Sequence, residues 1–216
     1  MERRIKNLLK EYEKRQKEIK RKLREFENVL KRSEERVFSE LCFCLCTPQS
    51  RAKICEEVIC RLEKNRLLFN GNYNQILNSL KGVRFSKNKA KYIIKAREFF
   101  TKNGKLKIKD KIKDKDTWEL REWLVKNIKG LGYKEATHFL RNVGLNKNLA
   151  ILDRHILKNL VEFGIIKEIP KTLTRKKYFE IERKFQEFAE KIKIPLNELD
   201  LLFWSKETGE IRKKRF

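Results

Sequence analysis

Apolar residues recur every three, four or seven positions along most of this chain, and that spacing is typical of helices with one buried face. The pattern runs longest over residues 2–31, where it predicts a single amphipathic helix with a charged outer face. Further helices are predicted at 34–46, 50–64, 73–80, 86–101, 117–127, 133–142, 153–163, 174–192 and 195–204. The fold class predicted from this pattern is therefore all-α.

Turn-forming residues separate the predicted helices. An Asn-Gly-Asn turn occupies 70–72, and Gly144 closes the helix that precedes it. Between 102 and 115, Leu106 and Ile108 alternate with lysines, a pattern that is compatible with a short strand. Because lysine dominates this segment, we expect an irregular, solvated connection instead.

Three parts of different character follow one another along the chain. Residues 1–33 form the long charged helix, which we expect to pack on the body of the protein. Residues 34–204 are expected to form two helical subdomains with a cleft between them, and to include a helical hairpin at 117–144. Residues 205–216 are expected to be a basic, partly extended tail.

Positive charge dominates the composition. The 216 residues include 55 Lys and Arg against 30 Asp and Glu, which gives a formal net charge of +25. Such a surplus indicates a polyanionic partner, most simply nucleic acid. An anionic membrane surface fits less well, because no strip of exposed aromatic residues accompanies the charge. No apolar run is long enough to span a membrane and no signal peptide is visible, so we expect a cytoplasmic or nucleoid-associated protein without a membrane partner.

The charge is concentrated in one segment. Charges of both signs alternate over residues 1–36, which predicts an ordinary solvated helix face. Residues 81–109 contain one acidic residue, Glu98, and are the better candidate for phosphate contacts, which give affinity without sequence choice. Eleven basic residues lie in this block: Lys81, Arg84, Lys87, Lys89, Lys91, Lys95, Arg97, Lys102, Lys105, Lys107 and Lys109.

The cysteines indicate a reducing compartment. All five lie in a single stretch, and their odd number and close spacing do not resemble a disulfide framework. A C-x-C-x-C run inside an apolar segment also lacks the second ligand pair of a zinc site, so we expect no metal. They are predicted to be small hydrophobic core residues: Cys42, Cys44, Cys46, Cys55 and Cys60. The abundance of Lys, Arg and Glu is typical of thermophile proteins.

A glycine-containing turn joins the helices predicted on either side of residue 130. Gly130 and Gly132 allow the backbone to approach a phosphate closely, and the N–H groups that open the second helix then point at the anion. Lys129 and Tyr133 flank these glycines and are further candidates for DNA contact. The hairpin therefore predicts a grip on one DNA strand that does not depend on sequence.

The same residues resemble a known family. Residues 128–136 read IKGLGYKEA and are similar to the helix-hairpin-helix motif of the DNA glycosylase superfamily that includes endonuclease III, with Ile128 for the usual Leu and Lys129 where Pro is frequent. Residues 152–155 read LDRH and fit the aspartate motif that follows in that superfamily. The resemblance implies that Lys134 is the nucleophile and that Asp153 is the essential carboxylate.

Other segments narrow the resemblance. Residues 82–85 read GVRF, 89–93 read KAKYI and 204–209 read WSKETG; with the short length, they resemble the compact archaeal-type 8-oxoguanine DNA glycosylase/AP lyases over roughly 34–210. The resemblance implies a bifunctional base-excision repair enzyme that acts as a monomer on double-stranded DNA containing a damaged base. No cysteine follows Cys60, so the C-terminal iron–sulfur cluster of endonuclease III relatives cannot form at its usual place, and no cofactor is expected.

The implied chemistry suits these residue types. A neutral Lys134 amine would attack the sugar C1′ and displace the base, and β-elimination from the resulting Schiff base would break the 3′ phosphate bond. Lys129 and the helix N-terminus would supply positive potential beside the amine, and Asp153 would stabilise the cationic charge that develops on the sugar.

Flipping a nucleotide out of the duplex leaves a gap that the protein must fill. By resemblance, Gln49 inserts into the duplex, while Arg84 and Phe85 act near the orphaned base and the kink. Trp204 and Phe216 are candidates for the pocket that receives the flipped base.

Simpler interpretations remain open for these residues. Gln49 can be an ordinary helix-start residue, Asp153 a helix N-cap, Phe85 a core residue, and Trp204 a packing residue of the last helix. For the whole protein, the alternatives are a glycosylase for oxidised pyrimidines or mismatched bases and a DNA-binding protein that uses the hairpin only as a phosphate clamp. The pairing of Lys134 with Asp153 argues against a clamp, which needs neither.

Overall fold

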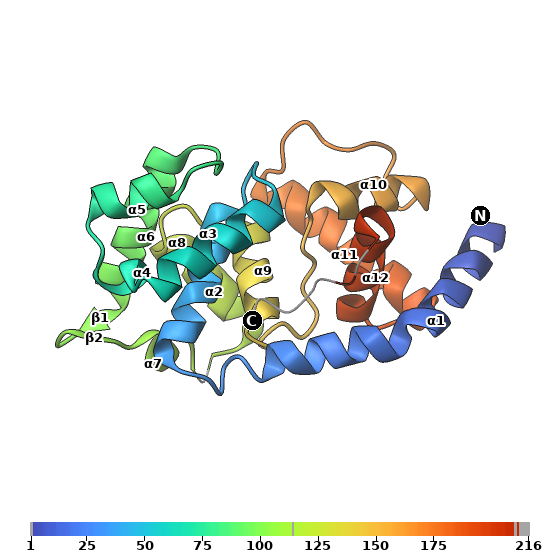
Figure 1. Cartoon of the computed structure of the whole chain (residues 1–216). Coiled ribbons are helices and arrows are strands. Elements are labelled where there is room, and N and C mark those ends of the chain that lie inside the picture. Colours follow the sequence, from blue (N-terminus) through green and yellow to red (C-terminus); the bar gives the residue numbers. More distant parts are fainter. Residues whose placement is uncertain (1, 114, 210, 212–216) are drawn as a thin grey trace.

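The structure, a computed structural model, describes residues 2–113, 115–209 and 211 and consists almost entirely of helices (Figure 1). Its one two-stranded antiparallel sheet in those residues pairs β1 (Thr101–Lys102) with β2 (Lys105–Leu106). The helices are α1 (Glu2–Glu27), α2 (Glu34–Cys46), α3 (Ala52–Lys64), α4 (Leu67–Asn70), α5 (Tyr73–Ser79), α6 (Ser86–Phe100), α7 (Ile108–Ile112), α8 (Thr117–Asn127), α9 (Tyr133–Asn142), α10 (Arg154–Glu162), α11 (Arg175–Lys191) and α12 (Leu196–Thr208). The predicted all-α class is confirmed.

Two hydrophobic cores lie beneath these helices. One is built by α2 to α9 and buries residues such as Phe38, Phe43 and Phe139, while the other is built by α1 and α10 to α12 around Phe185 and Phe203. Figure 1 shows α2 to α8 on one side of the molecule, α10 to α12 on the other, and α9 between them. The two cores are the two predicted helical subdomains.

Buried ion pairs join the two cores. The Arg121 guanidinium on α8 donates to both carboxylate oxygens of Glu182 on α11, at 2.7 and 2.9 Å, and both side chains are buried. Arg141 on α9 likewise donates to Asp200 on α12 at 2.8 Å. Paired charges with several hydrogen bonds fix orientation as well as distance, so α8 and α9 are held firmly against the second core.

The first helix is shorter than predicted. It ends at Glu27 instead of residue 31, and the chain then turns through short-range hydrogen bonds from Val29 to Phe26 and from Arg32 to Val29. Ser33 separates the two helices, because its hydroxyl accepts the Arg36 N–H as the N-cap of α2. An N-cap residue needs an extended backbone, so one helix cannot run through it into the next.

The segment after α6 was wrongly predicted to be an irregular, solvated connection. It contains β1, β2 and the short helix α7, whose Ile108 and Ile112 are fully buried in the first core. The turn of the β-hairpin at Asn103 and Gly104 has positive φ at both residues, which suits a tight antiparallel connection. Two isoleucines four residues apart were enough to anchor a helix despite the surrounding lysines.

The last helix continues beyond the predicted end at residue 204. It reaches Thr208, and Gly209 stops it with a φ of +79°. Residues 205–208 are therefore helical and not an extended tail, and Ser205 is buried. The four-residue helix α4 was not predicted, because so short a segment carries no helical periodicity.

The cysteines contribute to the first core. Cys42, Cys44, Cys46 and Cys55 are fully buried, and Cys60 is half-buried. The Cys55 thiol donates to the Cys46 carbonyl at 3.2 Å. Their predicted role as small hydrophobic residues is confirmed for the four buried ones. Among the described residues, no helix is long and apolar enough to cross a membrane.

Candidate active site

The predicted hairpin forms between α8 and α9. Its turn at 128–132 places Gly130 at a φ of +94°, so close to the Tyr92 ring that a Cβ there would overlap it. Gly132 is the N-cap of α9, and its N–H donates to the Glu135 carboxylate at 3.3 Å. Both glycines are exposed, so a phosphate can approach the backbone N–H groups at the positive end of α9.

Lys134 is the second residue of α9. Its side chain is 24% exposed, and its Nζ forms an ion pair with the Glu135 Oε1 at 2.8 Å. The ammonium of Lys89 lies nearby: burial lowers the pKa of Lys89, and the positive charge of Lys134 lowers it further. The candidate nucleophile thus sits at the protein surface beside one carboxylate and near a second, buried amine.

Asp153 is the N-cap of α10. Its carboxylate accepts the Ile156 N–H at 2.9 Å, so the helix-cap interpretation of this residue is correct. The carboxylate stays half-buried at the start of the helix. A cap and a catalytic carboxylate are compatible roles, because the cap fixes the position of the charge.

The strand-like segment before Asp153 is clamped by α11. The Tyr178 hydroxyl donates to the Ala150 carbonyl at 2.6 Å, and the Leu152 N–H lies 3.4 Å from the same hydroxyl oxygen. Glu182 accepts the Ala150 N–H at 2.7 Å. Since Glu182 also binds Arg121, the position of Asp153 is tied to the ion pair between the two cores.

Asp200 is a second carboxylate close to this segment. Burial raises the pKa of Asp200 to about 6, and the negative charge of Asp153 acts in the same direction. The Arg141 guanidinium and a hydrogen bond from the Ile151 backbone oppose the shift. The sequence did not predict that Asp200 lies near Asp153, because nothing in the pattern of α12 distinguishes Asp200 from its neighbours.

The residues predicted to enter the duplex lie on two turns that touch. Gln49 is exposed in the turn between α2 and α3, and Arg84 and Phe85 lie in the turn before α6. The Arg84 N–H donates to the Ser50 hydroxyl at 3.0 Å and so joins the turns. Gln49 and Phe85 have positive φ, +54° and +56°. Phe85 is 58% exposed, so its interpretation as a core residue is wrong.

The other residues predicted around the hairpin differ in exposure. Lys129 is exposed, as a phosphate ligand should be. Tyr133 is half-buried and faces inward: its hydroxyl donates to Glu122 at 3.1 Å and accepts from Arg175 at 2.9 Å, and its ring packs on Phe179. Tyr133 therefore anchors the hairpin to α11, a contact that the sequence did not predict.

The two residues predicted for the base pocket lie at the C-terminal end. Trp204 is half-buried on α12, so burial alone decides neither for packing nor for contact with a base. Phe216 lies outside the described residues.

One residue of the basic block differs from the prediction. Lys89 is 3% exposed, so it is not a phosphate ligand as its place among the eleven basic residues suggested. The spacing of Lys89 from Ile93, Ala96 and Phe100 could have distinguished it from the other basic residues, because those three residues lie on the buried face of α6. The exposed residues Lys87 and Lys91 remain candidates for DNA contact.

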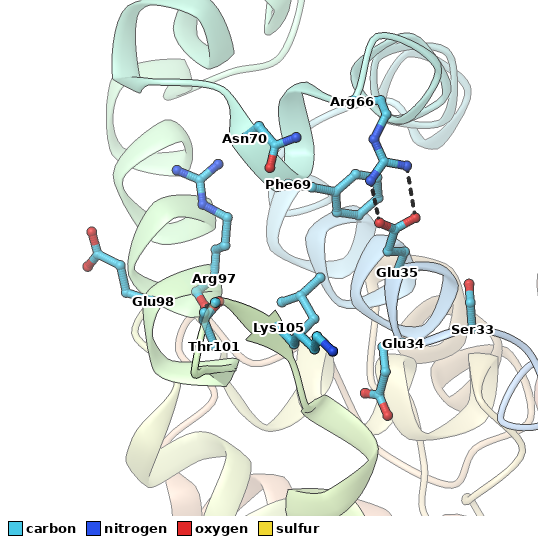
Figure 2. Close-up of a pocket in the computed structure, with 12 residues that line it drawn as sticks. Ser33, Glu34, Glu35, Arg66, Phe69, Asn70, Arg97, Glu98, Thr101 and Lys105 are labelled. Carbon is cyan, nitrogen blue, oxygen red and sulfur yellow. Dashed lines mark hydrogen bonds and ion pairs between the residues drawn. The ribbon is translucent and has the colours of Figure 1, made fainter.

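Two hollows beside the first core contain neither candidate catalytic residue in their lining. A groove of about 800 Å³ is bounded by the start of α2, α4, the end of α6 and the β-hairpin, and Figure 2 shows Arg66 paired with Glu35 along its wall. A second hollow of about 440 Å³ lies between α3 and α5. Arg97 and Lys105 of the basic block line the groove and Lys81 lines the second hollow, but neither hollow contains Lys134 or Asp153. The candidate active site is therefore the hairpin and its surroundings.

Comparisons with known proteins agree with this geometry. The family model described as 8-oxoguanine DNA glycosylase matches residues 19–194. A protein of Fusobacterium nucleatum named 8-oxoguanine DNA glycosylase/AP lyase is 48% identical over 197 residues, which are 90% of this chain and 91% of that protein.

Solved structures give the same result. The crystal structure of the Methanocaldococcus jannaschii 8-oxoguanine DNA glycosylase superposes with a TM-score of 0.85 at 38% identity, covering 97% of this chain and 95% of that one. A crystal structure of the glycosylase/lyase of the same organism, in complex with a 15mer DNA containing 8-oxoguanine, superposes with a TM-score of 0.84 at 38% identity, covering 95% and 99% of the two chains. This chain therefore belongs to the 8-oxoguanine DNA glycosylase family.

Proposed function

We propose that this protein is a bifunctional DNA glycosylase/AP lyase that excises 8-oxoguanine from duplex DNA and then cleaves the strand on the 3′ side. The observation that carries the proposal is the hairpin itself, with Lys134 in the first turn of α9 and Asp153 at the N-cap of α10. Membership of the family and the name of the Fusobacterium relative support the choice of lesion and both activities.

In the proposed reaction, Lys134 acts through its neutral amine. Its Nζ forms a bond to C1′ of the flipped nucleotide as the glycosidic bond breaks, and the base leaves with that electron pair and takes up a proton. Loss of a proton from the nitrogen and opening of the sugar give a Schiff base. Removal of a C2′ proton then expels the 3′ phosphate and breaks the strand.

The surroundings of Lys134 suit these steps. In the structure its ammonium is paired with Glu135, so the pair must separate and the amine must lose a proton before it attacks. The N-terminus of α9 supplies positive potential beside the amine. Asp153 supplies the negative charge that balances the cationic sugar.

The duplex would lie along the boundary between the two cores, across the hairpin. Gly130 and Gly132 offer backbone N–H groups to a phosphate, and Gln49, Arg84 and Phe85 reach the gap left by the flipped base. Trp204 and Phe216 would contact the flipped base. This chemistry needs neither a metal nor an iron–sulfur cluster, and we propose that the protein acts as a monomer.

Borohydride trapping on a panel of duplexes, each with one lesion, tests this function. Borohydride reduces a Schiff base to a stable protein–DNA adduct, so it reports covalent chemistry and lesion choice together. We expect the fastest trapping with 8-oxoguanine. Faster trapping with thymine glycol would contradict 8-oxoguanine as the preferred lesion, but it would not contradict the Schiff-base mechanism.

A substitution at Lys134 tests the nucleophile. Lys134→Gln should abolish both trapping and strand cleavage, because an amide cannot form a Schiff base, and it should leave duplex binding nearly intact. Lys126→Gln is the matched control, since Lys126 is an exposed lysine in the last turn of α8. Trapping of the Lys134→Gln protein at the wild-type rate would exclude Lys134 as the nucleophile.

A further inference from the structure

Lys89 is a buried lysine in the first turn of α6. It is 3% exposed and lies on the same helix face as Ile93, Ala96 and Phe100, all of which belong to the first core. An ammonium group in such a place loses its hydration, which is costly unless protein acceptors replace the water. The acceptors of the Lys89 ammonium therefore indicate its role in the structure.

All three acceptors lie in one turn. The Lys89 Nζ donates to the Cys46 carbonyl at 2.6 Å, to the Pro48 carbonyl at 2.7 Å and to the Ser50 hydroxyl at 3.1 Å. A lysine ammonium has three N–H donors, so these contacts account for all of them. The turn they hold, residues 46–50, is the one that presents Gln49 with positive φ.

The network continues into the neighbouring turn. Ser50 accepts a second hydrogen bond, from the backbone N–H of Arg84, at 3.0 Å. Arg84 lies between Gly82 and Phe85, which both have positive φ. One buried ammonium thus fixes the turn of Gln49 directly and the turn of Arg84 and Phe85 through Ser50.

We propose that Lys89 is a positioning residue for base flipping, which holds the two turns in one arrangement so that Gln49, Arg84 and Phe85 enter the duplex together. The inference rests on the proposed function, because it assigns those three side chains to the gap in the duplex. Lys89 itself touches neither the DNA nor the reacting atoms, since its amine is buried and bonded within the protein.

Burying the Lys89 ammonium costs free energy, and this cost supports a specific role for the residue. Burial lowers the pKa of Lys89, and the nearby charge of Lys134 lowers it further, so the charged amine is held in an unfavourable place. An apolar residue would pack against the first core without that cost. An apolar residue cannot donate hydrogen bonds to two carbonyl oxygens and a hydroxyl. It therefore cannot hold the two turns in a fixed arrangement.

A simpler role must be separated from this one. Cys46 is the last residue of α2, and a lysine commonly satisfies the unpaired carbonyls at the end of a helix. If Lys89 only caps α2, removing it lowers the stability of the protein but affects the reaction rates on different DNA substrates equally. The test therefore compares a substrate that needs insertion with one that does not.

The substitution is Lys89→Met, which keeps an unbranched side chain as long as the aliphatic stem of lysine and removes the donors. The substrates are 8-oxoguanine opposite cytosine in a duplex and a ready-made abasic site in a single strand, which has no stacked base to extrude. We expect excision from the duplex to fall about tenfold or more, as lost hydrogen bonds from a charged donor imply, while cleavage of the single strand changes by less than about twofold. The fluorescence of 2-aminopurine placed beside the lesion should report less unstacking.

Lys22→Met is the matched control. Lys22 is also a buried lysine, but it lies on α1, where it pairs with Glu25 at 2.9 Å, far along the chain from both turns. We expect it to leave the ratio of the two rates unchanged. Equal losses of Lys89→Met on the two substrates, or no loss on either, would overturn the positioning role.

Ser50→Ala tests the same network if Lys89→Met fails to fold. It removes the joint between the turns and keeps Lys89, so duplex excision should fall and single-strand cleavage should not. A Ser50→Ala protein with a wild-type ratio of rates would also overturn the proposal. Failure of the proposed function gives a different result, because the wild-type protein itself would then form no borohydride adduct.

Discussion

The carboxylate of Asp153 caps α10 and, in the proposed mechanism, also balances the positive charge that develops on the sugar. Asp153→Asn separates the two roles, because an amide oxygen can still accept the Ile156 N–H but carries no charge. We expect the free energy of unfolding to change by less than about 1 kcal/mol. Excision of 8-oxoguanine should fall on the order of 100-fold, because a preorganised electrostatic contact to the transition state is lost.

Asp153→Ala provides the comparison. It removes both the cap and the charge, so it should lose about 1 kcal/mol of stability in addition to excision. Thermal unfolding followed by circular dichroism and single-turnover excision measure the two effects separately. An unfolded Asp153→Asn protein, or one that excises at the wild-type rate, would leave Asp153 with a structural role alone.

Asp200 should make stability depend on pH. Burial raises its pKa from 3.8 to about 6, so between these values the folded protein holds a proton that the unfolded chain has released. The contribution of Asp200 to the free energy of unfolding is therefore largest below about pH 4, falls as the pH rises through about 6, and is constant above about pH 7.

Asp200→Asn removes this titration and isolates its effect. The stability of the wild type relative to that of Asp200→Asn should fall between about pH 4 and about pH 7, by at most about 3 kcal/mol for a pKa shift of roughly two units. Urea unfolding of both proteins across this range measures it. A difference that stays constant with pH would mean that Asp200 titrates normally in the folded protein.

Single residues could be predicted from the sequence only where a motif fixes their place. The hairpin motif identified Lys134 and Asp153 as candidates, and their catalytic roles remain predictions. Lys89 was grouped with ten other basic residues, because a charge count does not show which way a side chain points. The contacts of Asp200 and Tyr178 with the segment before Asp153 could not be predicted, because both residues reach it from helices far along the chain.

The hairpin turn between α8 and α9 depends on a glycine at position 130. Gly130→Ala would place a Cβ against the Tyr92 ring and force an alanine to a φ of +94°. Either α6 or the turn must shift, so we expect a loss of stability of about 2 kcal/mol or more and a weaker grip on duplex DNA. Thermal unfolding and duplex binding by fluorescence anisotropy would show both effects.

Gly104→Ala distinguishes overlap from backbone strain. Gly104 also has positive φ, +71°, but no atom lies within 4 Å of the place where its Cβ would be. It should lose about 1 kcal/mol from strain and keep normal DNA binding, because the β-hairpin lies at the far end of α6. If the two substitutions cost the same, contact between Gly130 and Tyr92 does not shape the turn.

Whole elements were predicted well where periodicity was long and poorly where it was short. The long amphipathic helices appeared close to their predicted places, but residues 102–115 were predicted to be a solvated connection because lysines surround Ile108 and Ile112. Burial of two side chains outweighed the polar composition. The end of α12 was also missed, although Gly209 is the kind of residue that stops a helix.

At the scale of the molecule, two cores meet at the hairpin. The Arg121–Glu182 and Arg141–Asp200 pairs hold α8 and α9 against α11 and α12, and Glu182 extends this contact to the backbone before Asp153. The first core positions Lys134 and the second positions Asp153. Two subdomains were predictable from helix number and spacing, but these pairings were not, because their partners are about 60 residues apart.

The distribution of exposed charge should decide where DNA lies. Lys87 and Lys91 occupy the first two turns of α6, beside the turn that carries Arg84 and Phe85, whereas Lys102 and Lys105 lie in the β-hairpin beyond its other end. A helix of 15 residues separates the two pairs by roughly 20 Å. Both pairs are exposed and carry the same charge, so they differ only in position.

Replacing each pair with glutamine measures its contact with phosphate. For duplex DNA, the logarithm of the binding constant falls with the logarithm of salt concentration by about 0.9 for each phosphate contacted, so Lys87→Gln with Lys91→Gln should flatten the slope by about 1 to 2. Lys102→Gln with Lys105→Gln should lower affinity slightly at low salt, through the long-range field, and leave the slope almost unchanged. The reverse result would place the duplex over the β-hairpin, and equal effects would mean that the positive charge attracts DNA without direct contact at either end of α6.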